Sequence, residues 1–423
     1  MKILNFGSCN VDGVYRLPHF VRPGETLAAQ SFCRYPGGKG LNQSIALARA
    51  GSSVFHAGCV GEDDPFLRRL LCENGVDTTY LATVSAPTGQ AVIFVNDSGE
   101  NSIVLYPGAN AAVTQAWILQ VLSHFSEGDL LLLQNEISGL RPLISAAHAK
   151  KMRIIWNPAP FDPSLHDLDL SKLDWLICNE TEAAGFFGED QPEAFLTHLA
   201  SACPKLGAVV TLGKQGCIYV ENGKIRRHPA YQVQPVDTTA AGDTFVGYFT
   251  AQISAGKDAA QAVRLASAAA ALATTKAGAA SSIPTLAEVR NALRTLIPYP
   301  PASETENKKD LTRTYFSSHL PDARLSELAA VLHYSPYYAC RWLRKTFGAS
   351  FSDLLQKARC EAAAELLAKT DLPVSEIISR VGYQNASFFR ACFDKQYALS
   401  PSQYRAQCRA KESISFKTGG VFS

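Results

Sequence analysis

Long apolar runs are missing from this 423-residue chain. No stretch approaches the ~18 consecutive apolar residues of a membrane span, and the nearest, Leu265–Ala273, is short and rich in Ala and Ser. The first residues, Met1–Gly7, lack the apolar region of a signal peptide. The sequence therefore predicts a soluble protein and argues against a membrane-spanning or exported one.

Paired cysteines are also missing. The eleven cysteines are scattered, odd in number and without a Cys-x-x-Cys spacing, which argues against both a disulfide framework and a zinc cluster. The nine histidines add no cluster with ligand spacing. We expect a protein of the reducing cytoplasm.

The length and the distribution of charge predict more than one domain. Hydrophobic residues make up 47% of the chain, enough for two cores at roughly 100–200 residues per domain. Three prolines and a polar run within 297–309 read as a linker. From Glu304 onward 17 Lys and Arg face 12 Asp and Glu, a net +5, which leaves 23 basic and 26 acidic residues, a net −3, before it. Such asymmetry is typical of an attached nucleic-acid module.

The expected boundaries follow from this pattern. We predict a large domain at 1–297, a linker at 298–310, a small domain at 311–410 and a disordered polar tail at 411–423. In the large domain, short apolar runs alternate with helical patterns, which predicts a βαβ protein with a mostly parallel sheet. The expected buried strands are Lys2–Gly7, Val54–Val60, Ala91–Val95, Leu130–Gln134, Arg153–Asn157, Trp175–Cys178 and Val209–Leu212, and the expected helices between them include Gly40–Ala50, Asp64–Asn74 and Ser138–Ala149.

A glycine-rich motif, Gly37-Gly38-Lys39-Gly40-Leu41-Asn42-Gln43, precedes a predicted helix. It is not a P-loop, because Gly40 stands where that motif needs Ser or Thr. Glycines let the backbone approach a ligand and leave N–H groups free, and the amides of Asn42 and Gln43 suit sugar hydroxyls. An ordinary glycine turn before a helix is the alternative.

A second motif, Asp237-Thr238-Thr239-Ala240-Ala241-Gly242-Asp243-Thr244, leads into the predicted helix Val246–Gln252. Small residues at a helix N-terminus can form an anion hole for a phosphoryl group. A carboxylate beside it, Asp243, is placed to take a proton from an attacking hydroxyl. The alternative is that Asp243 only caps the helix.

Together and in this order, the two motifs resemble the ribokinase family of sugar kinases, the PfkB-type kinases, over about residues 1–296. The resemblance implies an α/β ribokinase-like fold, in which strands near Asp12–Arg34 and Gly89–Tyr106 form a small β-lid used for dimerisation. It implies that Asp243 is the catalytic base and that Ala240, Ala241 and Gly242 form the anion hole. Sugar contacts would come from Asn10, Asp12, Gly38, Lys39, Gly40, Asn42, Glu136 and Asp243.

The same resemblance implies the remaining ligands of a kinase. ATP would be bound by Asn179, Thr211, Gly213, Lys214, Gly216, Gly242 and Ser267, although Ser267 is smaller than the usual polar group near adenine. A monovalent cation such as K⁺ would be ringed by Asp237, Thr239, Ala273, Lys276, Gly278 and Ser282, and Glu182 would tune the Mg²⁺ site indirectly. The motifs are most similar to the ribokinase type, which implies transfer of phosphate from ATP to the primary hydroxyl of a pentose, ribose to ribose 5-phosphate. Deoxyribose and a ribonucleoside are the competing substrates.

The small domain carries the same layout twice: a short helix, a turn and a second helix, as in a helix-turn-helix. The first copy is Ser326–Leu332 followed by Pro336–Phe347, and the second is Val374–Val381 followed by Ala386–Gln396, with Leu354–Leu367 as a connecting helix. A scaffolding bundle is the alternative. Val381-Gly382-Tyr383 and the closing Ser400-Pro401-Ser402-Gln403-Tyr404-Arg405 resemble the AraC-type DNA-binding domain.

This second resemblance implies that the second helix of each copy enters a major groove of double-stranded DNA. Tyr337, Cys340 and Arg341 would face bases, Arg344 and Lys345 would contact phosphates, and Ser387 and Arg390 would contact DNA from the second copy. That copy departs from the family, because Arg390 and Ala391 stand in exchanged order and Asp394 replaces a basic residue near phosphate. We expect its contact with DNA to be the weaker one.

Two functions remain open at this point. In one, the chain is an active sugar kinase that the DNA-binding domain tethers or autoregulates. In the other, the kinase fold is a sensor of sugar or nucleotide and the output is transcription. The presence of Asp243, Gly242 and Lys39 favours retained catalysis, because a sensor does not need the base.

Overall fold

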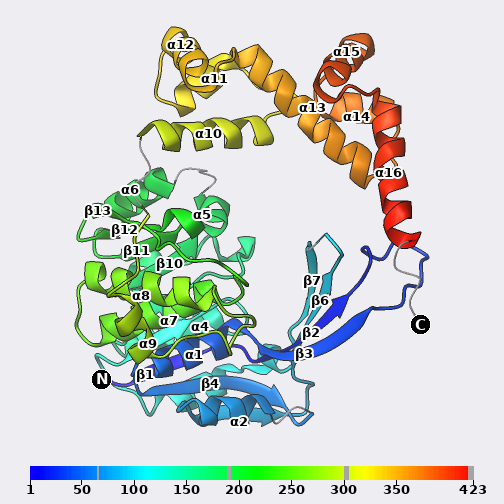
Figure 1. Cartoon of the computed structure of the whole chain (residues 1–423). Coiled ribbons are helices and arrows are strands. Elements are labelled where there is room, and N and C mark those ends of the chain that lie inside the picture. Colours follow the sequence, from blue (N-terminus) through cyan, green and yellow to red (C-terminus); the bar gives the residue numbers. More distant parts are fainter. Residues whose placement is uncertain (64–65, 99, 188–191, 300–303, 418–423) are drawn as a thin grey trace. The chain divides into compact units, whose positions relative to one another are not determined.

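The computed structural model describes residues 1–63, 66–98, 100–187, 192–299 and 304–417 (Figure 1). The chain divides into two compact units, Met1–Pro300 and Pro301–Ser423. Among the described residues, no helix is long and apolar enough to cross a membrane.

The first unit is built on a nine-stranded sheet in the order β13-β12-β11-β10-β9-β8-β1-β4-β5. Its strands from β11 to β5 pair in parallel, and the edge strands β12 and β13 are antiparallel, which confirms the expected mostly parallel α/β fold. The strands are β1 (Ile3–Phe6), β4 (Val54–Gly61), β5 (Asp77–Val84), β8 (Leu130–Leu133), β9 (Arg153–Trp156), β10 (Trp175–Asn179), β11 (Gly207–Thr211), β12 (Cys217–Glu221) and β13 (Lys224–His228).

Helices cover both faces of this sheet, and alternate residues of each strand face opposite layers. In β8, Leu130 and Leu132 join one hydrophobic core while Leu131 and Leu133 join the other. The first core is shared with α1 (Lys39–Arg49), α2 (Phe66–Glu73), α7 (Ala241–Ser254), α8 (Ala259–Ala273) and α9 (Leu286–Ala292). The second is shared with α3 (Gln115–Leu122), α4 (Leu140–Ala149), α5 (Glu180–Phe187) and α6 (Pro192–Ala202).

A separate four-stranded sheet projects from this layer structure in the order β3-β2-β6-β7 (blue to cyan in Figure 1). Its strands are β2 (Asn10–Arg16), β3 (Ser31–Gly37), β6 (Gly89–Val95) and β7 (Asn101–Tyr106). We had expected Ala91–Val95 as a buried strand, but most of it is only half-buried, and every residue of β7 is exposed. Among the described residues, none of β7 belongs to either hydrophobic core of this unit, in agreement with its exposure.

The second unit is all-helical among its described residues. Its helices are α10 (Glu304–Ser318), α11 (Leu325–Val331), α12 (Pro336–Phe347), α13 (Phe351–Lys369), α14 (Val374–Arg380), α15 (Ala386–Tyr397) and α16 (Pro401–Lys417). Two small hydrophobic cores lie in it, one under α11 and α12 and one under α14 and α15, and α13 contributes to both. The two helix-turn-helix units and their connecting helix therefore form at the predicted positions.

Two segments differ from the sequence-based expectation. Helix α10 begins at Glu304, inside the stretch 298–310 expected as a linker, and its Tyr315 and Phe316 pack in the first core of the second unit. Helix α16 runs on to Lys417, into the tail 411–423 expected to be disordered. Both stretches are polar and rich in charge, so composition alone could not separate an exposed helix from a linker.

Candidate functional site

Polar side chains follow the carboxyl ends of the central strands, where open α/β sheets bind their ligands. Ser8 follows β1, Gln134 follows β8, Asn157 follows β9, and Asn179 ends β10. The N-termini of α1 and α7 reach the same edge, because Asn42 and Gln43 of α1 both hydrogen-bond to Asp243 of α7. The two sequence motifs, 200 residues apart, therefore meet at one site.

The Asp243 carboxylate is held by two amides. Asn42 donates its Nδ2 to Oδ2 at 3.0 Å, and Gln43 donates its Nε2 to Oδ1 at 2.9 Å. Helix α7 begins at Ala241, earlier than the expected Val246, so Asp243 lies in its first turn. Ala240 before it adopts a left-handed φ of 58°, and no side chain caps the helix, which leaves N–H groups of the first turn to a ligand.

Gln43 has a different role from the one its motif suggested. It is fully buried and bound on both sides of its amide: Nε2 also donates to Asn157 Oδ1 at 2.9 Å, and Oε1 accepts from Gln134 Nε2 at 2.7 Å. It cannot reach a sugar and instead positions Asp243. Asn42 leaves its buried Oδ1 without a protein partner. The sequence analysis did not single out Gln134 as a site residue, because its function depends on contacts across the sheet.

The glycine loop lies against the segment after β1. A Cβ on Gly40 would stand 2.3 Å from the backbone nitrogen of Ser8, so only glycine allows this approach. Glu136 accepts hydrogen bonds from the Ser8 hydroxyl and from the backbone N–H of Lys39, the latter at 3.0 Å. Residues predicted to bind sugar thus assemble around one loop: Asn10, Asp12, Gly38, Lys39, Gly40, Asn42 and Glu136.

Charge is concentrated at this point. Burial raises the pKa of the Asp12 carboxyl to about 7, with further contributions from the charges of Glu136 and Asp243. Burial also raises the pKa of Glu182, against a backbone hydrogen bond from Asn179 and the charge of Lys39. Burial lowers the pKa of Lys39, but the carboxylates of Asp243, Glu136 and Glu182 outweigh it and raise that pKa overall. One ammonium group therefore serves several carboxylates.

Two hollows open at the site. One, of about 320 Å³, lies beside the small sheet, and its lining includes Asn10, Tyr106, Asn110 and Glu136. The other, of about 310 Å³, is largely apolar and is lined by the predicted nucleotide residues Thr211, Gly213, Lys214, Gly216, Gly242 and Ser267, together with Ala241, Phe245 and Tyr299. Asn179 was predicted to contact nucleotide, but its side chain caps α5 by accepting from Glu182 N at 2.8 Å, while Glu182 accepts from Asn179 N.

The predicted cation residues come from two segments joined by one carboxylate. Asp237 accepts from the backbone N–H and hydroxyl of Thr239 and, at 2.9 Å, from the backbone N–H of Gly278. Ser282 is fully buried, and Ala273 ends α8. The side chain of Lys276 points away to Glu288, at 3.0 Å. Among the described residues, no group of three or more His, Cys, Asp and Glu side chains could hold a metal ion by itself.

In the second unit, α12 presents a cationic face. Tyr337, Arg341, Arg344 and Lys345 are exposed and lie at helical spacing, while Ala339, Trp342 and Leu343 are buried. Cys340, predicted to face bases, is only half-buried and lies at the edge of this face. Ser335 caps the helix by accepting from Tyr338 N.

Helix α15 presents a face that is less cationic than that of α12. Ser387, Arg390 and Asp394 are exposed at a spacing of three to four residues, so they share a face. The carboxylate lies on the face that carries the arginine. Asn385 caps this helix by accepting from Phe388 N at 2.9 Å.

Comparison with known proteins agrees with this geometry. Residues 1–286 match the model of the pfkB family carbohydrate kinases, and residues 328–407 match a helix-turn-helix domain model of the AraC type. A ribokinase of Haemophilus influenzae is 40% identical over 291 residues, covering 67% of this chain and 95% of its own.

Two solved structures are similar to the first unit. A ribokinase of Cryptococcus neoformans in complex with ADP is 33% identical with a TM-score of 0.62, covering 69% of this chain and 99% of its own. An Arabidopsis thaliana ribokinase complexed with ribose and ATP is 28% identical with a TM-score of 0.59, covering 69% and 98%. The chain belongs to the pfkB family of carbohydrate kinases, as a ribokinase-like kinase fused to an AraC-type helix-turn-helix domain.

Proposed function

We propose that residues 1–297 phosphorylate the primary hydroxyl of a pentose, ribose above all, with ATP, and that residues 311–410 bind operator DNA to regulate transcription. The observation that carries the kinase proposal is the Asp243 carboxylate, fixed by Asn42 and Gln43 at the N-terminus of α7. The ribose and ATP bound by the Arabidopsis relative support the choice of both substrates.

Sugar binds at the glycine loop in this proposal. Asn10, Asp12 and Asn42 hold its hydroxyls, Gly38 and Gly40 let the backbone approach it, and Lys39 and Glu136 complete the loop. The unpartnered Oδ1 of Asn42 supports this, because a buried acceptor without a hydrogen bond costs about 1–3 kcal/mol that a hydroxyl donor recovers. Asp243 takes the proton of the primary hydroxyl as its oxygen attacks the γ-phosphoryl group.

ATP occupies the 310 Å³ cavity, with its base against Ser267 and its phosphates toward Lys214 and the first turn of α7. The N–H groups at Ala240, Ala241 and Gly242 hold negative charge on the phosphoryl group as it transfers. No atom lies within 4 Å of the position that a Cβ would take on Gly242, so the phosphate has room. The buried Asn179–Glu182 pair lies next to this charge.

Two cations fit the residues present. Mg²⁺ is commonly held by one or two carboxylates together with substrate phosphates, and Glu182 and Asp243 supply carboxylates that a single ammonium group, Lys39, balances. When bound, Mg²⁺ neutralises phosphate charge. K⁺ is held by carbonyl oxygens, and Asp237 ties together the two segments that would provide them, with Thr239, Ala273, Lys276, Gly278 and Ser282 around it.

A homodimer through the small sheet completes the proposed assembly. Phe32, Tyr35, Ile103, Val104, Leu105 and Tyr106 of this sheet are each 46–58% exposed. Exposed apolar patches of this kind mark interaction sites.

Turnover is tested by coupled assay of the purified chain with ATP, Mg²⁺ and K⁺ against pentoses, deoxyribose and nucleosides. Saturable turnover of ribose above the others supports the proposal. Absence of turnover, with ribose or ATP still raising the melting temperature, would make the first unit a sensor.

Asp243→Asn should lower kcat by about 10²–10⁴-fold, the usual contribution of a general base, because an amide cannot accept the proton. Ribose binding by calorimetry should change less than kcat, since the remaining oxygen can accept from Gln43 and the new amide N–H can donate to the unpartnered Oδ1 of Asn42 once that amide turns. Asp258→Asn, at the exposed N-cap of α8, is the control and should leave kcat unchanged. Equal rates for Asp243→Asn and the wild type would contradict the proposed base.

Asp12→Asn should change how stability depends on pH. Between about pH 4 and pH 7 the folded protein keeps a proton on Asp12 that the unfolded chain releases, so the free energy of unfolding falls by up to about 1.4 kcal/mol per pH unit. The variant lacks this fall. The free energy of unfolding of the variant minus that of the wild type, measured by urea denaturation, should therefore increase from pH 5 to pH 7 and stay constant above pH 7. Asp97→Asn, at an exposed carboxylate in the turn after β6, should follow the wild type, and a constant Asp12→Asn difference would refute the assignment.

Arg341→Ala should weaken binding to DNA from upstream of the protein's own gene by about 10-fold or more, the value of a good contact to a base. Arg344→Ala should reduce the salt slope by about one unit, as for a phosphate contact. Arg390→Ala should have a smaller effect, because Asp394 shares its face. Fluorescence anisotropy over a KCl series measures all three, with Lys357→Ala, an exposed lysine of α13, as control. Unchanged affinity and slope for both α12 variants would exclude α12 as the DNA-reading helix.

A double substitution Ile103→Lys/Leu105→Lys in β7 should shift the protein from dimer to monomer in sedimentation velocity, because like charges would face the proposed partner. Ile225→Lys, on the edge strand β13, should leave the dimer intact. A monomeric wild type, or a dimer that survives the double substitution, would rule out the small sheet as the interface.

A further inference from the structure

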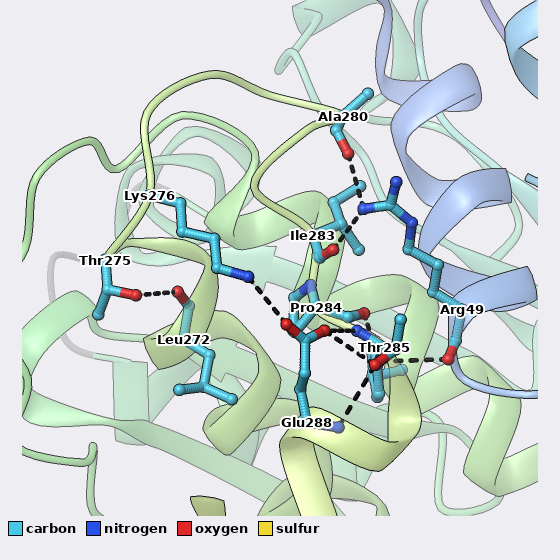
Figure 2. Close-up of polar contacts among 10 residues, drawn as sticks. Arg49, Leu272, Thr275, Lys276, Ala280, Ile283, Pro284, Thr285 and Glu288 are labelled. Atoms are coloured by element: carbon cyan, nitrogen blue, oxygen red, sulfur yellow. Dashed lines mark hydrogen bonds and ion pairs between the residues drawn. The ribbon is translucent and has the colours of Figure 1, made fainter.

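A single arginine connects the sugar-binding helix with the proposed cation loop (Figure 2). Arg49 is the last residue of α1, whose first turns carry the sugar-binding residues. Its Nη1 donates to the backbone oxygen of Ala280 at 3.0 Å and to that of Ile283. These two carbonyls lie on either side of Ser282, in the segment that the proposed cation residues Gly278 and Ser282 belong to.

Helices α1 and α7 are packed closely against each other beside this loop. A Cβ on Gly247 of α7 would stand 2.4 Å from the Cβ of Ala46 and 3.0 Å from the backbone oxygen of Gln43, so the helices touch at a glycine. Further along α7, the fully buried Tyr248 donates its hydroxyl to the backbone oxygen of Pro284 at 2.7 Å. The end of the cation loop is thus held from α7 as well as from α1.

The start of the cation loop, at Lys276, is bound to α9 by an ion pair. Lys276 pairs with Glu288 at 3.0 Å, and Glu288 forms a capping box with Thr285 at the start of that helix. Hydrogen bonds from the Thr285 backbone, from Lys276 and from the Thr285 hydroxyl lower the pKa of Glu288 to about 2. Figure 2 shows Lys276 and Arg49 on opposite sides of the loop, each bound to a different anchor. The exposed Lys276–Glu288 pair is the weaker fastening, as surface ion pairs contribute little.

We propose that Arg49 is a positioning residue that couples the two sites, so that a monovalent cation in the loop and a sugar at the start of α1 each raise the other's affinity. This rests on the proposed kinase function and its cation site. A bound cation would restrict the positions of the loop carbonyls. Because the Arg49 guanidinium links this loop to the C-terminal end of α1, the restriction would extend to α1 and so to Asn42 and Gln43 in its first turns. Reciprocity follows, because a coupling free energy between two ligands acts equally on both.

The chemistry of arginine suits this role. The guanidinium keeps its charge, and while its Nη1 donates to both loop carbonyls its Nε holds a third partner, whereas lysine has a single nitrogen on a flexible stem. Arg49 also donates its Nε to Asn74 Oδ1 at 2.9 Å, which locks the orientation of the fork. Burial lowers the pKa of Arg49, while the Tyr248 and Glu288 groups act in the opposite direction and raise it. The net lowering agrees with a guanidinium that is half-buried in the fold.

The test measures D-ribose affinity by calorimetry in KCl and in tetramethylammonium chloride at equal ionic strength. We expect K⁺ to lower the dissociation constant of ribose about 5-fold or more in the wild type. It should leave this constant nearly unchanged in Arg49→Ala and lower it to an intermediate degree in Arg49→Lys. The K⁺ concentration giving half of the thermal shift, with and without ribose, must change by the same factor in each protein.

Arg68→Ala is the matched control. Arg68 lies on α2 and donates in the same way to two backbone oxygens, those of Thr78 and Leu81, away from the cation loop. It should lower the melting temperature and keep the wild-type effect of K⁺. Should Arg49→Ala not fold, Arg49→Lys and Arg49→Gln carry the same comparison.

The possible failures can be told apart. A wild-type K⁺ effect retained in every Arg49 variant overturns the coupling and leaves the kinase proposal standing. No K⁺ effect in the wild type overturns the cation site and the coupling with it. No ribose binding at all overturns the proposed substrate.

Discussion

The position of one carboxylate constrains the rest of the first unit. Asp243 accepts from two amides of α1, and one of these, Gln43, is itself held by Gln134 and Asn157. Because those two residues follow β8 and β9, the sheet sets the place of the carboxylate through a chain of hydrogen bonds. Apart from the unpartnered oxygens of Asn42 and Gln134, this buried polar network is hydrogen-bonded, and such a network favours one arrangement of the elements that it joins. The helices α1 and α7 can therefore differ in sequence elsewhere but must keep their N-terminal turns together.

The electrostatics of the site follow from the same arrangement. Asp12, Glu136, Glu182 and Asp243 lie near one lysine, so the empty site carries more negative than positive charge. In the proposed function a triphosphate would add to that imbalance, and it would meet the dipole ends of helices together with Lys39 and Lys214. Cations bound with the nucleotide would then reduce the net negative charge. Burial is the main reason that the pKa of Asp12 is raised, and the charges of Glu136 and Asp243 add to it, so that a proton on Asp12 removes one negative charge from this site.

Sequence patterns predicted the fold, and they also picked out many of the residues that the structure brings together at the candidate site, for reasons that differ by residue. Some residues can be recognised from the sequence alone, because a close backbone approach requires glycine and the proposed chemistry requires an acid within a short segment. These are the glycines at 38, 40 and 242 and the acid at 243. The role of Gln43 cannot be recognised in this way, because an amide in the glycine motif fits a ligand contact and a core contact equally well. Its partners Gln134 and Asn157 lie about 90 and 114 residues away. Ala240 and His333 adopt left-handed φ without being glycine, which local propensity does not predict. The helical content of 304–310 depends on packing of Tyr315 and Phe316, later in the same helix.

The joining of a kinase with a DNA-binding domain has a consequence for the signal that such a chain can carry. A ligand shifts an equilibrium only by its difference in affinity for two states, and a kinase converts its sugar to the phosphate at roughly 1–100 turnovers per second, a range typical of kinases. The occupancy of the sugar site then follows the steady state of supply and turnover, and its midpoint is KM rather than the dissociation constant. If the sugar-bound state governs DNA binding, Asp243 would influence transcription as well as chemistry, because a slower base would lengthen the life of the sugar-bound state. A binding-only sensor would respond at its dissociation constant, whatever the state of Asp243.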